Sequence, residues 1–443
     1  MIPNVATNKI VNFEEAAYRA ATPRSLEEFE RTQAVMPGGA KGAYYYAPYP
    51  LTMERGEGCY LFDVDERRYL DFAGHHTSQI LGHGHPAVLE AVAAQMQRGI
   101  ALSAPNGAEA ALAREICERV PSVERLRFCN SGTEATLHAI RLARGHAHKP
   151  KIAKFEGAYH GSHDAVEISV SPPLELAGPA DAPNAVPGAG GMAPHAAGEI
   201  VILPYDDEAA VERLIEKHAH ELACVIFEPK AGILWQRPEF VRFVREITQR
   251  HGILLIMDEI VSFRLGRGGA QELCGVQPDL TTFGKIIGGG FPVGAFGGRA
   301  DIMDLLDQSQ GATGYYQSGT FSAHPITMAA GLAMLKQLTP EAFAHLDRLG
   351  ERLRTALSDL FRQRGVAAQV VGASSLFSIH FSAEPMVNYR SLARSDKAAA
   401  RRVFLALLDQ GCYLSPGLTM NALSLPMTGS HIDVLVAAVS RAL

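Results

Sequence analysis

Lys285 stands where an apolar, strand-like run meets a cluster of glycines. The run Leu280–Gly284 precedes it, and Ile286, Ile287 and three glycines follow. Apolar neighbours keep the lysine stem in a medium of low dielectric constant, which disfavours the ammonium form and leaves a nucleophilic amine. Lys285 is therefore suited to forming a Schiff base with a carbonyl compound. The alternative is a surface lysine in a loop, the usual situation of lysine in proteins.

A carboxylate ends the apolar run Ile253–Met257, where Asp258 is followed by Glu259. The carboxyl ends of buried parallel strands border the crevice in which open α/β sheets bind ligands. There Asp258 can pair with the protonated pyridine nitrogen of pyridoxal phosphate, a charge pair that makes the ring an electron sink. A strand-end carboxylate that caps a helix is the alternative.

A phosphate site is predicted after the short strand 125–129. Ser131, Gly132 and Thr133 open a helix, and Ser131 with Glu134 has the spacing of a capping box. Free N–H groups at a helix N-terminus attract anions, Gly132 permits close approach, and the two hydroxyls add donors. A plain helix cap explains the same pattern equally well.

Three more segments contain residues suited to the same chemistry. Tyr159 and His160 follow a strand-like segment, and Tyr159 can lay an aromatic face on a cofactor ring. Glu228 ends the strand 224–227, and the hydroxyl of Thr320 can reach a phosphate. Each has an ordinary alternative: a core tyrosine, a solvated strand end and a turn threonine. The order of these residues along the chain is more informative than any one of them.

In that order the motifs resemble those of the class III, fold-type I aminotransferases, which use pyridoxal 5'-phosphate. The resemblance runs from MPGG at 36–39 through LGHGHP at 81–86 to YLSP at 413–416. It implies that Lys285 forms the Schiff base with the cofactor and that Asp258 pairs with the ring nitrogen. It further implies that Tyr159 stacks on the ring, with the cofactor-binding residues His160 and Glu228 nearby.

The resemblance also implies how the phosphate is bound and how the chain assembles. Ser131, Gly132 and Thr133 are implied to hold the phosphate. Thr320 resembles the residue that reaches the phosphate of the neighbouring subunit, so a homodimer is expected. The stretch GKIIGGG at 284–290 is typical of the branch with glutamate-1-semialdehyde 2,1-aminomutases and β-phenylalanine aminotransferases.

The sequence departs from the glutamate-1-semialdehyde 2,1-aminomutase and β-phenylalanine aminotransferase patterns at positions expected to bind the substrate. Lys41 and His76 stand near the places where the aminomutase pattern has arginine and tryptophan. The Ser-Pro at 415–416 is followed by glycine, where the β-phenylalanine branch has arginine. Because lysine does not reproduce the bidentate fork of arginine, carboxylate binding is expected to rest on Lys41 or Arg264 and to be weaker than in the arginine-bearing relatives.

An aromatic, partly polar pocket wall is expected from His75, His76 and the three tyrosines Tyr44, Tyr45 and Tyr46. Such a wall suits a bulky substrate side chain. The residues expected to bind substrate are Lys41, Tyr44, His76 and Arg264.

The expected reaction is the transfer of an amino group from an amine or β-amino acid to a 2-oxo acid. Two alternatives use the same residues. An aminomutase moves the group within one bound molecule, and an amino acid racemase returns the proton to the substrate carbon. A non-catalytic relative would be expected to lack Lys285 or Asp258, and both are present.

The sequence predicts an α/β fold with a large, mostly parallel sheet domain and a smaller C-terminal α+β domain. Residues 86–328 alternate strands with helices, as a parallel sheet requires, and form the predicted cofactor-binding domain. Residues 1–85 are expected to be the N-terminal segment of the small domain. Residues 329–443 are expected to complete that small domain.

Three local features are predicted outside the catalytic motifs. A helix is expected within 13–31, which is rich in helix formers, and a strand pair at 58–62 and 68–70. The segment 171–198 is rich in Pro, Gly and Ala and has almost no periodicity. It is either a lid over the site or a surface insertion.

Composition and net charge limit the kinds of binding partner and the compartment expected for this protein. The chain has 443 residues and a net charge of -6, which gives no basic footprint for nucleic acid. No apolar run approaches a membrane span, and no secretory signal pattern opens the sequence. Six scattered cysteines without metal spacing indicate reduced thiols and a cytoplasmic location.

Overall fold

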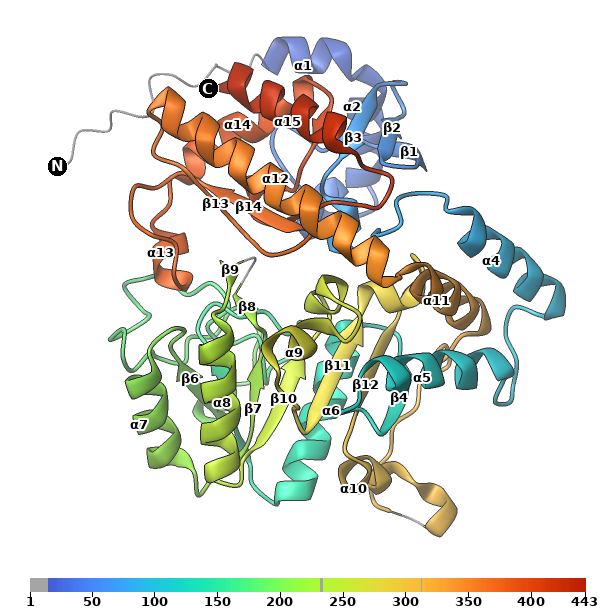
Figure 1. Ribbon diagram of the computed structural model, residues 1–443, viewed down its shortest axis with the longest axis vertical. Coiled ribbons are helices and arrows are strands. Elements are labelled where there is room, and N and C mark those ends of the chain that lie inside the picture. The colour runs from blue at the N-terminus through green and yellow to red at the C-terminus, as the bar shows by residue number, and fades with distance from the viewer. Residues whose placement is uncertain (1–14, 232–233, 312) are drawn as a thin grey trace. The chain divides into compact units, whose positions relative to one another are not determined.

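Figure 1 shows the computed structural model, which describes residues 15–231, 234–311 and 313–443. The chain folds into two compact units. The larger unit contains Pro86–Phe343 and Val387–Ala393, and the smaller contains the chain up to His85 together with Ala344–Met386 and Arg394–Leu443. The division after Phe343 lies beyond the limit at 328 that the sequence suggests, and the sequence-derived domains stay a prediction.

A seven-stranded sheet forms the centre of the larger unit. In spatial order its strands are β4 (Arg125–Cys129), β12 (Gly294–Gly298), β11 (Leu280–Gly284), β10 (Leu254–Asp258), β7 (Leu222–Phe227), β5 (Lys151–Phe155) and β6 (Ile200–Leu203). The strands from β11 to β6 are parallel, and β12 is antiparallel to both of its neighbours. The predicted α/β fold with a large, mostly parallel sheet is therefore confirmed.

Helices cover both faces of this sheet, as buried parallel strands require. In Figure 1, α7 (Glu208–His218) and α8 (Pro238–Arg250) lie in front, and α6 (Gly132–Ala147) packs along β12, β11, β10 and β7. Strands β7 and β10 are buried along their whole length, which explains their continuous apolar sequences. The remaining helices of this unit are α4 (Pro86–Arg98), α5 (Gly107–Arg119), α9 (Gly269–Cys274), α10 (Ala300–Met303), α11 (Pro325–Gln337) and α13 (Tyr389–Ala393).

The smaller unit combines two sheets with helices. One sheet contains β1 (Met53–Glu57), β2 (Tyr60–Asp63), β3 (Arg68–Asp71) and β15 (Cys412–Tyr413), and the other contains β13 (Gln369–Val371), β14 (Leu376–His380) and β16 (Asn421–Ala422). The predicted strand pair is confirmed as β2 and β3. The helices are α1 (Glu15–Ala21), α2 (Pro23–Gln33), α3 (Gly74–Thr77), α14 (Lys397–Asp409) and α15 (Gly429–Ala442), with α12 (Pro340–Arg364) entering from the larger unit.

Within the described residues, the helix expected within 13–31 is divided into α1 and α2. It is interrupted at Thr22, and Pro23 occupies the first turn of α2, where a missing N–H costs nothing. None of the helices in the described ranges has the length and apolar character that crossing a bilayer requires.

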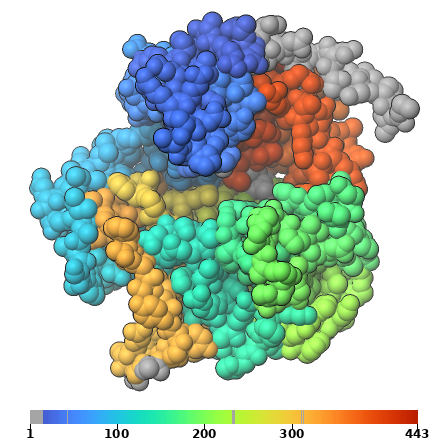
Figure 2. Space-filling model, turned by 180° about the vertical axis from the view of Figure 1, so that it is seen from behind, coloured from blue at the N-terminus to red at the C-terminus, as the bar shows by residue number. Residues whose placement is uncertain are grey.

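The segment 171–198 has neither strand nor α-helix, as its composition predicts. It is nevertheless held by side chains of the α13 region. Arg390 forms two hydrogen bonds with the Glu156 carboxylate, each 2.9 Å, and donates to the carbonyls of Ala177 and Gly178 at 3.0 and 2.8 Å. The segment belongs to the green surface of the larger unit in Figure 2.

Candidate active site

Lys285 begins the short 3-10 helix η6 (Lys285–Gly288) directly after β11. Its backbone is left-handed, with a φ of 51°, a conformation that costs a non-glycine residue about 1–2 kcal/mol. Such strain gathers at functional sites. Burial, reinforced by the like charge of Lys230, lowers the pKa of Lys285 to about 8. The side chain is thus a free amine for a substantial part of the time just above neutral pH.

Asp258 ends β10, the neighbour of β11, and is in register with Thr282. Its Oδ2 lies 2.7 Å from Nδ1 of His160. Its Oδ1 accepts hydrogen bonds from the Thr282 hydroxyl at 3.2 Å and from the Ile260 N–H at 3.1 Å. The residue is only 4% exposed, so these bonds fix one orientation of the carboxylate at the carboxyl end of the strand.

Glu228 and Lys230 form a buried ion pair at 2.9 Å beyond the end of β7. The other carboxylate oxygen of Glu228 accepts a hydrogen bond from the Tyr159 N–H at 3.4 Å. Lys230 lies in the hairpin of β8 (Lys230–Ala231) and β9 (Leu234–Trp235), in register with Trp235. Lys230 is not among the residues predicted from the sequence, although a lysine two residues after a strand-end glutamate was an available signal.

The turn between β4 and α6 has the helix cap that the sequence predicts. Ser131 Oγ accepts a hydrogen bond from the Glu134 N–H at 3.1 Å. The Glu134 carboxylate bonds the Asn130 N–H at 2.9 Å rather than that of Ser131, so the reciprocal half of the predicted capping box is wrong. The first N–H groups of α6 have no acceptor within the helix. They are therefore available to bind an anion.

Two glycines allow neighbouring chain segments to approach this turn closely. A Cβ added to Gly132 would lie 2.7 Å from Ile260 Cδ1, and one added to Gly161 would lie 2.7 Å from Thr133 Oγ1. Both distances are too short for a real side chain. The turn that contains Tyr159 and His160 therefore packs directly against the phosphate-site candidate.

Tyr159 presents its side chain outward from the larger unit, with 55% of the residue exposed. Its turn is held by Lys154, a buried lysine of β5 that is also absent from the predicted residues. Lys154 Nζ donates to the carbonyls of Ala158 at 2.9 Å and Ile168 at 2.6 Å. Burial lowers the pKa of Lys154 to about 7.

Thr320 follows Gly319, at which an added Cβ would lie 3.1 Å from Asn130 Nδ2. It is exposed and lines a surface pocket with Leu102 and Ser322. Ser322 Oγ is buried and has no hydrogen-bond partner among the described residues. The structure thus leaves Thr320 available to a group outside its own chain.

In the smaller unit, Lys41, Tyr44 and His76 form one cluster. Lys41 Nζ lies 4.4 Å from the centre of the Tyr44 ring, and the Tyr44 and His76 ring centres are 4.5 Å apart. The Tyr44 hydroxyl lies 2.9 Å from Nδ1 of His75. Tyr46 is buried and contacts the Tyr18 hydroxyl at 3.3 Å, so its assignment to the pocket wall is wrong.

The backbone around these histidines is unusual. Four consecutive residues, Gly74, His75, His76 and Thr77, have φ values of 52°, 49°, 51° and 73°. Asp71 Oδ1 supports the turn by accepting the N–H groups of Ala73 and Gly74. A left-handed run with three side chains is sterically costly, and it aims His75 and His76 at Tyr44.

Comparison with known proteins decides the family. The family described as Aminotransferase class-III matches residues 42–443. A glutamate-1-semialdehyde 2,1-aminomutase from Rhodopirellula baltica is 39% identical over 97% of this chain and 98% of that protein. The chain belongs to the class III aminotransferases. It is therefore an aminotransferase of a family that depends on pyridoxal 5'-phosphate.

Solved structures agree in fold and sequence. An omega-transaminase from Sphaerobacter thermophilus is 41% identical, with a TM-score of 0.91 and coverage of 96% of this chain and 98% of that one. A β-phenylalanine aminotransferase from Variovorax paradoxus is 39% identical, with a TM-score of 0.86 and coverage of 96% and 94%. The resemblance to class III aminotransferases, close to glutamate-1-semialdehyde 2,1-aminomutases and β-phenylalanine aminotransferases, is therefore confirmed.

The larger unit has a donor set that fits the cofactor of a class III aminotransferase. It combines an amine with a lowered pKa, Lys285, with a buried carboxylate, Asp258, and a helix N-terminus at Ser131. His160 adds a buried Nε2 that has no partner within the described ranges. These are the groups that an aldehyde, a protonated pyridine nitrogen and a phosphate each require.

The two cations expected to bind the substrate carboxylate, Lys41 and Arg264, have different environments. Arg264 is 1% exposed, and burial lowers the pKa of its guanidinium to about 9. The Ser415 hydroxyl bonds the Asn421 side chain and the Met420 N–H inside a tight turn. That turn contains no arginine, so Lys41 is the exposed cation of the expected set.

Proposed function

We propose that this class III aminotransferase moves an amino group from an aromatic or long-chain β-amino acid or amine to a 2-oxo acid. One observation supports the site above all others: Asp258 ends β10, and Lys285 directly follows the neighbouring parallel strand β11 at the same, carboxyl end. A nucleophilic amine beside a rigidly held carboxylate is the pair that pyridoxal phosphate chemistry needs.

The chain's own residues have separate tasks in this proposal. When bound, the cofactor supplies an aldehyde and an electron-withdrawing ring. Lys285 would hold the aldehyde through its amine, with loss of water, and would be displaced by the amine of the substrate. The freed Lys285 amine would then carry a proton to and from the carbon that bears the amino group. Asp258 keeps a proton on the ring nitrogen, and His160 and Thr282 orient that carboxylate.

Cofactor binding is assigned to residues that surround this pair. Ser131, Gly132 and Thr133 hold the phosphate, because the N-terminus of α6 offers N–H groups and a positive dipole end. Tyr159 stacks on the ring, and Glu228 positions the Tyr159 backbone. We assign Thr320 to the phosphate of a second copy, which makes the active unit a homodimer.

Substrate recognition is assigned to Lys41, Tyr44 and His76, together with Arg264. Lys41 is a point charge over an aromatic ring, so it attracts a carboxylate without fixing its orientation. The aromatic cluster favours a bulky side chain. The cysteines are all free thiols, which supports a reducing compartment such as the cytoplasm.

The deciding experiment measures acceptor dependence. Purified holoenzyme is mixed with β-phenylalanine, with pyruvate or 2-oxoglutarate present or omitted, and the new amino acid is quantified. We expect continuous turnover only when an acceptor is present, and no turnover for Lys285→Ala. Isomerisation or racemisation of the donor without any acceptor would replace this proposal by the aminomutase or racemase alternative.

Substrate choice is tested by comparing kcat/KM for a β-amino acid and for the amine that lacks its carboxylate. Because only Lys41 is an exposed cation of the set, we expect a preference for the acid of about tenfold, as for a single charged contact. Lys41→Met should remove that preference. A preference of several powers of ten would reveal a carboxylate clamp outside these residues.

A further inference from the structure

A second cavity in the larger unit lies between α6, the loop segment 163–165 and the segment 193–200, which contains the short 3-10 helix η4 (Ala196–Glu199) and the start of β6. Its volume is about 370 Å³, which is within the range of small-molecule sites. None of the residues assigned to the cofactor or substrate lines it. We call it the α6 cavity.

Cationic and neutral donors gather around this cavity. Arg141 and Arg144, three residues apart on α6, share one face of the helix. His163 and His195 face them from the loop segments. The walls between these groups are apolar and include Ile140.

The carboxylates of the α6 cavity are already engaged. Asp164 Oδ2 accepts the Ala193 N–H at 3.0 Å, and Glu199 Oε2 accepts from Arg144 Nη2 at 2.9 Å. Arg144 Nε is buried and has no partner in the described part of the chain, and no ion pair of Arg141 exists there. The two arginines and the two carboxylates balance in formal charge, so what the cavity offers to an anion, within the described residues, is the unpaired guanidinium of Arg141 and the free Nε of Arg144.

His163 connects the cavity to the cofactor site. Its Nε2 lies 3.2 Å from the Thr136 hydroxyl, which donates to the His160 carbonyl at 2.6 Å. His160 Nδ1 in turn lies 2.7 Å from Asp258. Because the single hydroxyl proton of Thr136 goes to a carbonyl, His163 must donate through Nε2, which leaves its Nδ1 as an acceptor.

We propose that the α6 cavity is a regulatory site for a small organic carboxylate with an apolar body. The carboxylate is bound by Arg141 and Arg144, and the hydrocarbon part lies on the apolar walls. Occupancy alters the cofactor site through His163, Thr136 and His160. The coupling rests on the proposed function of Asp258, whereas the binding does not.

Burial, the nearby His160 and Arg144 together lower the pKa of His163 to about 4. The ring is therefore neutral in the free protein, even though Asp164 opposes this shift. A carboxylate bound beside this ring would raise its pKa from that value, because an anion favours the charged imidazolium. Arg141, His195 and Glu199 are the other charged or titratable groups that line the cavity.

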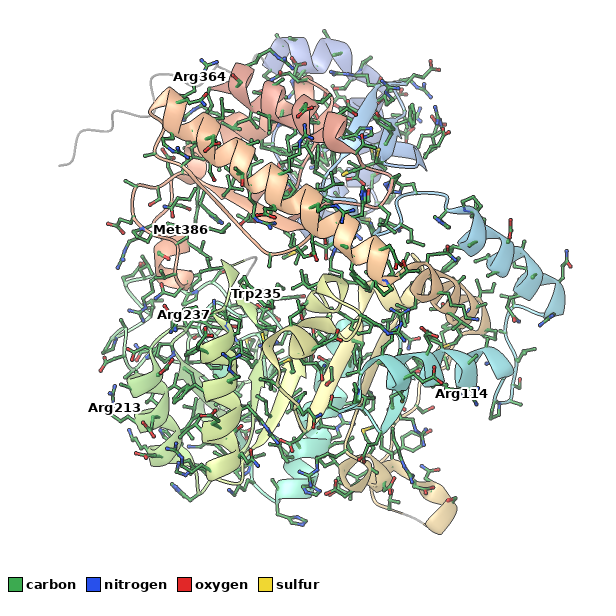
Figure 3. The ribbon with its side chains drawn as sticks, in the orientation of Figure 1. Arg114, Arg213, Trp235, Arg237, Arg364 and Met386 are labelled. Carbon is green, nitrogen blue, oxygen red and sulfur yellow. The ribbon has the colours of Figure 1, made fainter. Side chains whose placement is uncertain are left out.

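Binding is tested with 4-fluorobenzoate, observed by fluorine NMR with the holoenzyme. Arg144→Gln and Arg141→Gln should each weaken binding about tenfold or more, because a hydrogen bond to a charged group is lost. The second variant covers the case that Arg144→Gln misfolds. Arg213→Gln is the matched control, since Arg213 is an exposed arginine of α7 paired with Asp181 (Figure 3).

Further measurements distinguish probe binding at the α6 cavity from probe binding at other sites. Lys285→Ala should bind the probe as the wild type does; loss of binding there would mean that the probe occupies the cofactor site and would overturn the proposal. Equal affinity of both arginine variants and wild type would overturn it too. Competition by sulfate at the same affinity as the probe would refute the organic nature of the ligand.

Coupling is read from the visible absorbance of the bound cofactor. The probe should shift this spectrum in the wild type, whereas Thr136→Val should bind the probe and show no shift. A full shift in Thr136→Val would overturn the coupling route. If the holoenzyme binds the probe through Arg144 but catalyses no amino transfer, only the proposed function fails.

Discussion

At the scale of single residues, Lys285 and Lys230 are two cations in one buried neighbourhood. Like charges raise the cost of protonating either side chain, and burial adds to that cost. Glu228 pairs with Lys230 at 2.9 Å. Burial and the charge of Lys230 lower the pKa of Lys285.

The lowered pKa of Lys285, about 8, predicts how the apoprotein captures its cofactor. The neutral amine becomes more abundant as the pH rises through that value, so the capture rate should increase with a midpoint near pH 8. Lys230→Met should move the midpoint upward, because a like charge is removed and Glu228 is left unpaired. Quenching of the single tryptophan, Trp235 (Figure 3), is the readout, since Trp235 pairs with Lys230.

Lys217→Met is the control for this measurement, because Lys217 is an exposed lysine of α7 in the same unit. Its midpoint should equal that of the wild type. A midpoint above pH 10 in the wild type would show that Lys285 titrates as an ordinary lysine.

His160 is predicted to be a positioning residue that acts through Asp258. In His160→Leu the carboxylate loses one hydrogen bond of about 1.5–3 kcal/mol, and kcat should fall about 10- to 100-fold. His160→Asn, whose amide can replace Nδ1, should recover most of that rate. Equal losses in both variants, with equal amounts of folded protein, would contradict this assignment.

At the scale of elements, α13 restrains the long segment 171–198. Arg390 joins Glu156, at the end of β5, to carbonyls of that segment. The Tyr389 hydroxyl adds a hydrogen bond of 2.7 Å to the Pro172 carbonyl. A segment without periodicity thus gains order from side chains that are more than 200 residues away in sequence.

Arg390→Lys is predicted to loosen this segment, because lysine keeps the charge but cannot make the two-pronged contact with Glu156. Amide hydrogen exchange within 171–187 should become at least several-fold faster, while β5 and β7 stay protected. Arg394→Lys, at a nearby exposed arginine, should leave exchange unchanged. Unaltered exchange in Arg390→Lys would show that Arg390 does not hold the segment.

At the scale of the whole molecule, exposed apolar side chains gather near Thr320. Tyr316 and Phe321 are 70% and 62% exposed, and Met96, Ile100 and Leu102 are each about half exposed. In Figure 2 the cyan stretch around residue 100 and the orange stretch around 315 lie side by side. Apolar groups that gather in this way mark an interaction surface.

We therefore predict that Phe321→Asp converts a homodimer into monomers and weakens cofactor binding together with assembly. Sedimentation velocity and a cofactor titration measure the two effects. Thr320→Val should weaken cofactor binding about tenfold, by loss of one hydrogen bond to a charged phosphate, without dissociating the dimer. Full activity of a monomeric wild type would refute the shared site.

The local sequence determined the parts of this protein that depend on neighbours in the chain. Strand ends at Asp258 and Glu228, the cap at Ser131 and the setting of Lys285 follow from short runs of residue types. Their order was enough to predict the family, its cofactor and the α/β fold. Such features can be predicted from the sequence because hydrophobic periodicity and helix capping depend on only a few neighbouring residues.

Tertiary structure alone decided which side chains meet. The partnership of His160 with Asp258, the approach of Lys230 to Lys285, and the burial of Tyr46 each need elements that fold back on one another. The α6 cavity likewise arises where α6 meets the segments 163–165 and 193–200. No local pattern encodes these contacts, because desolvation and hydrogen-bond geometry depend on groups brought together only by the packed sheet.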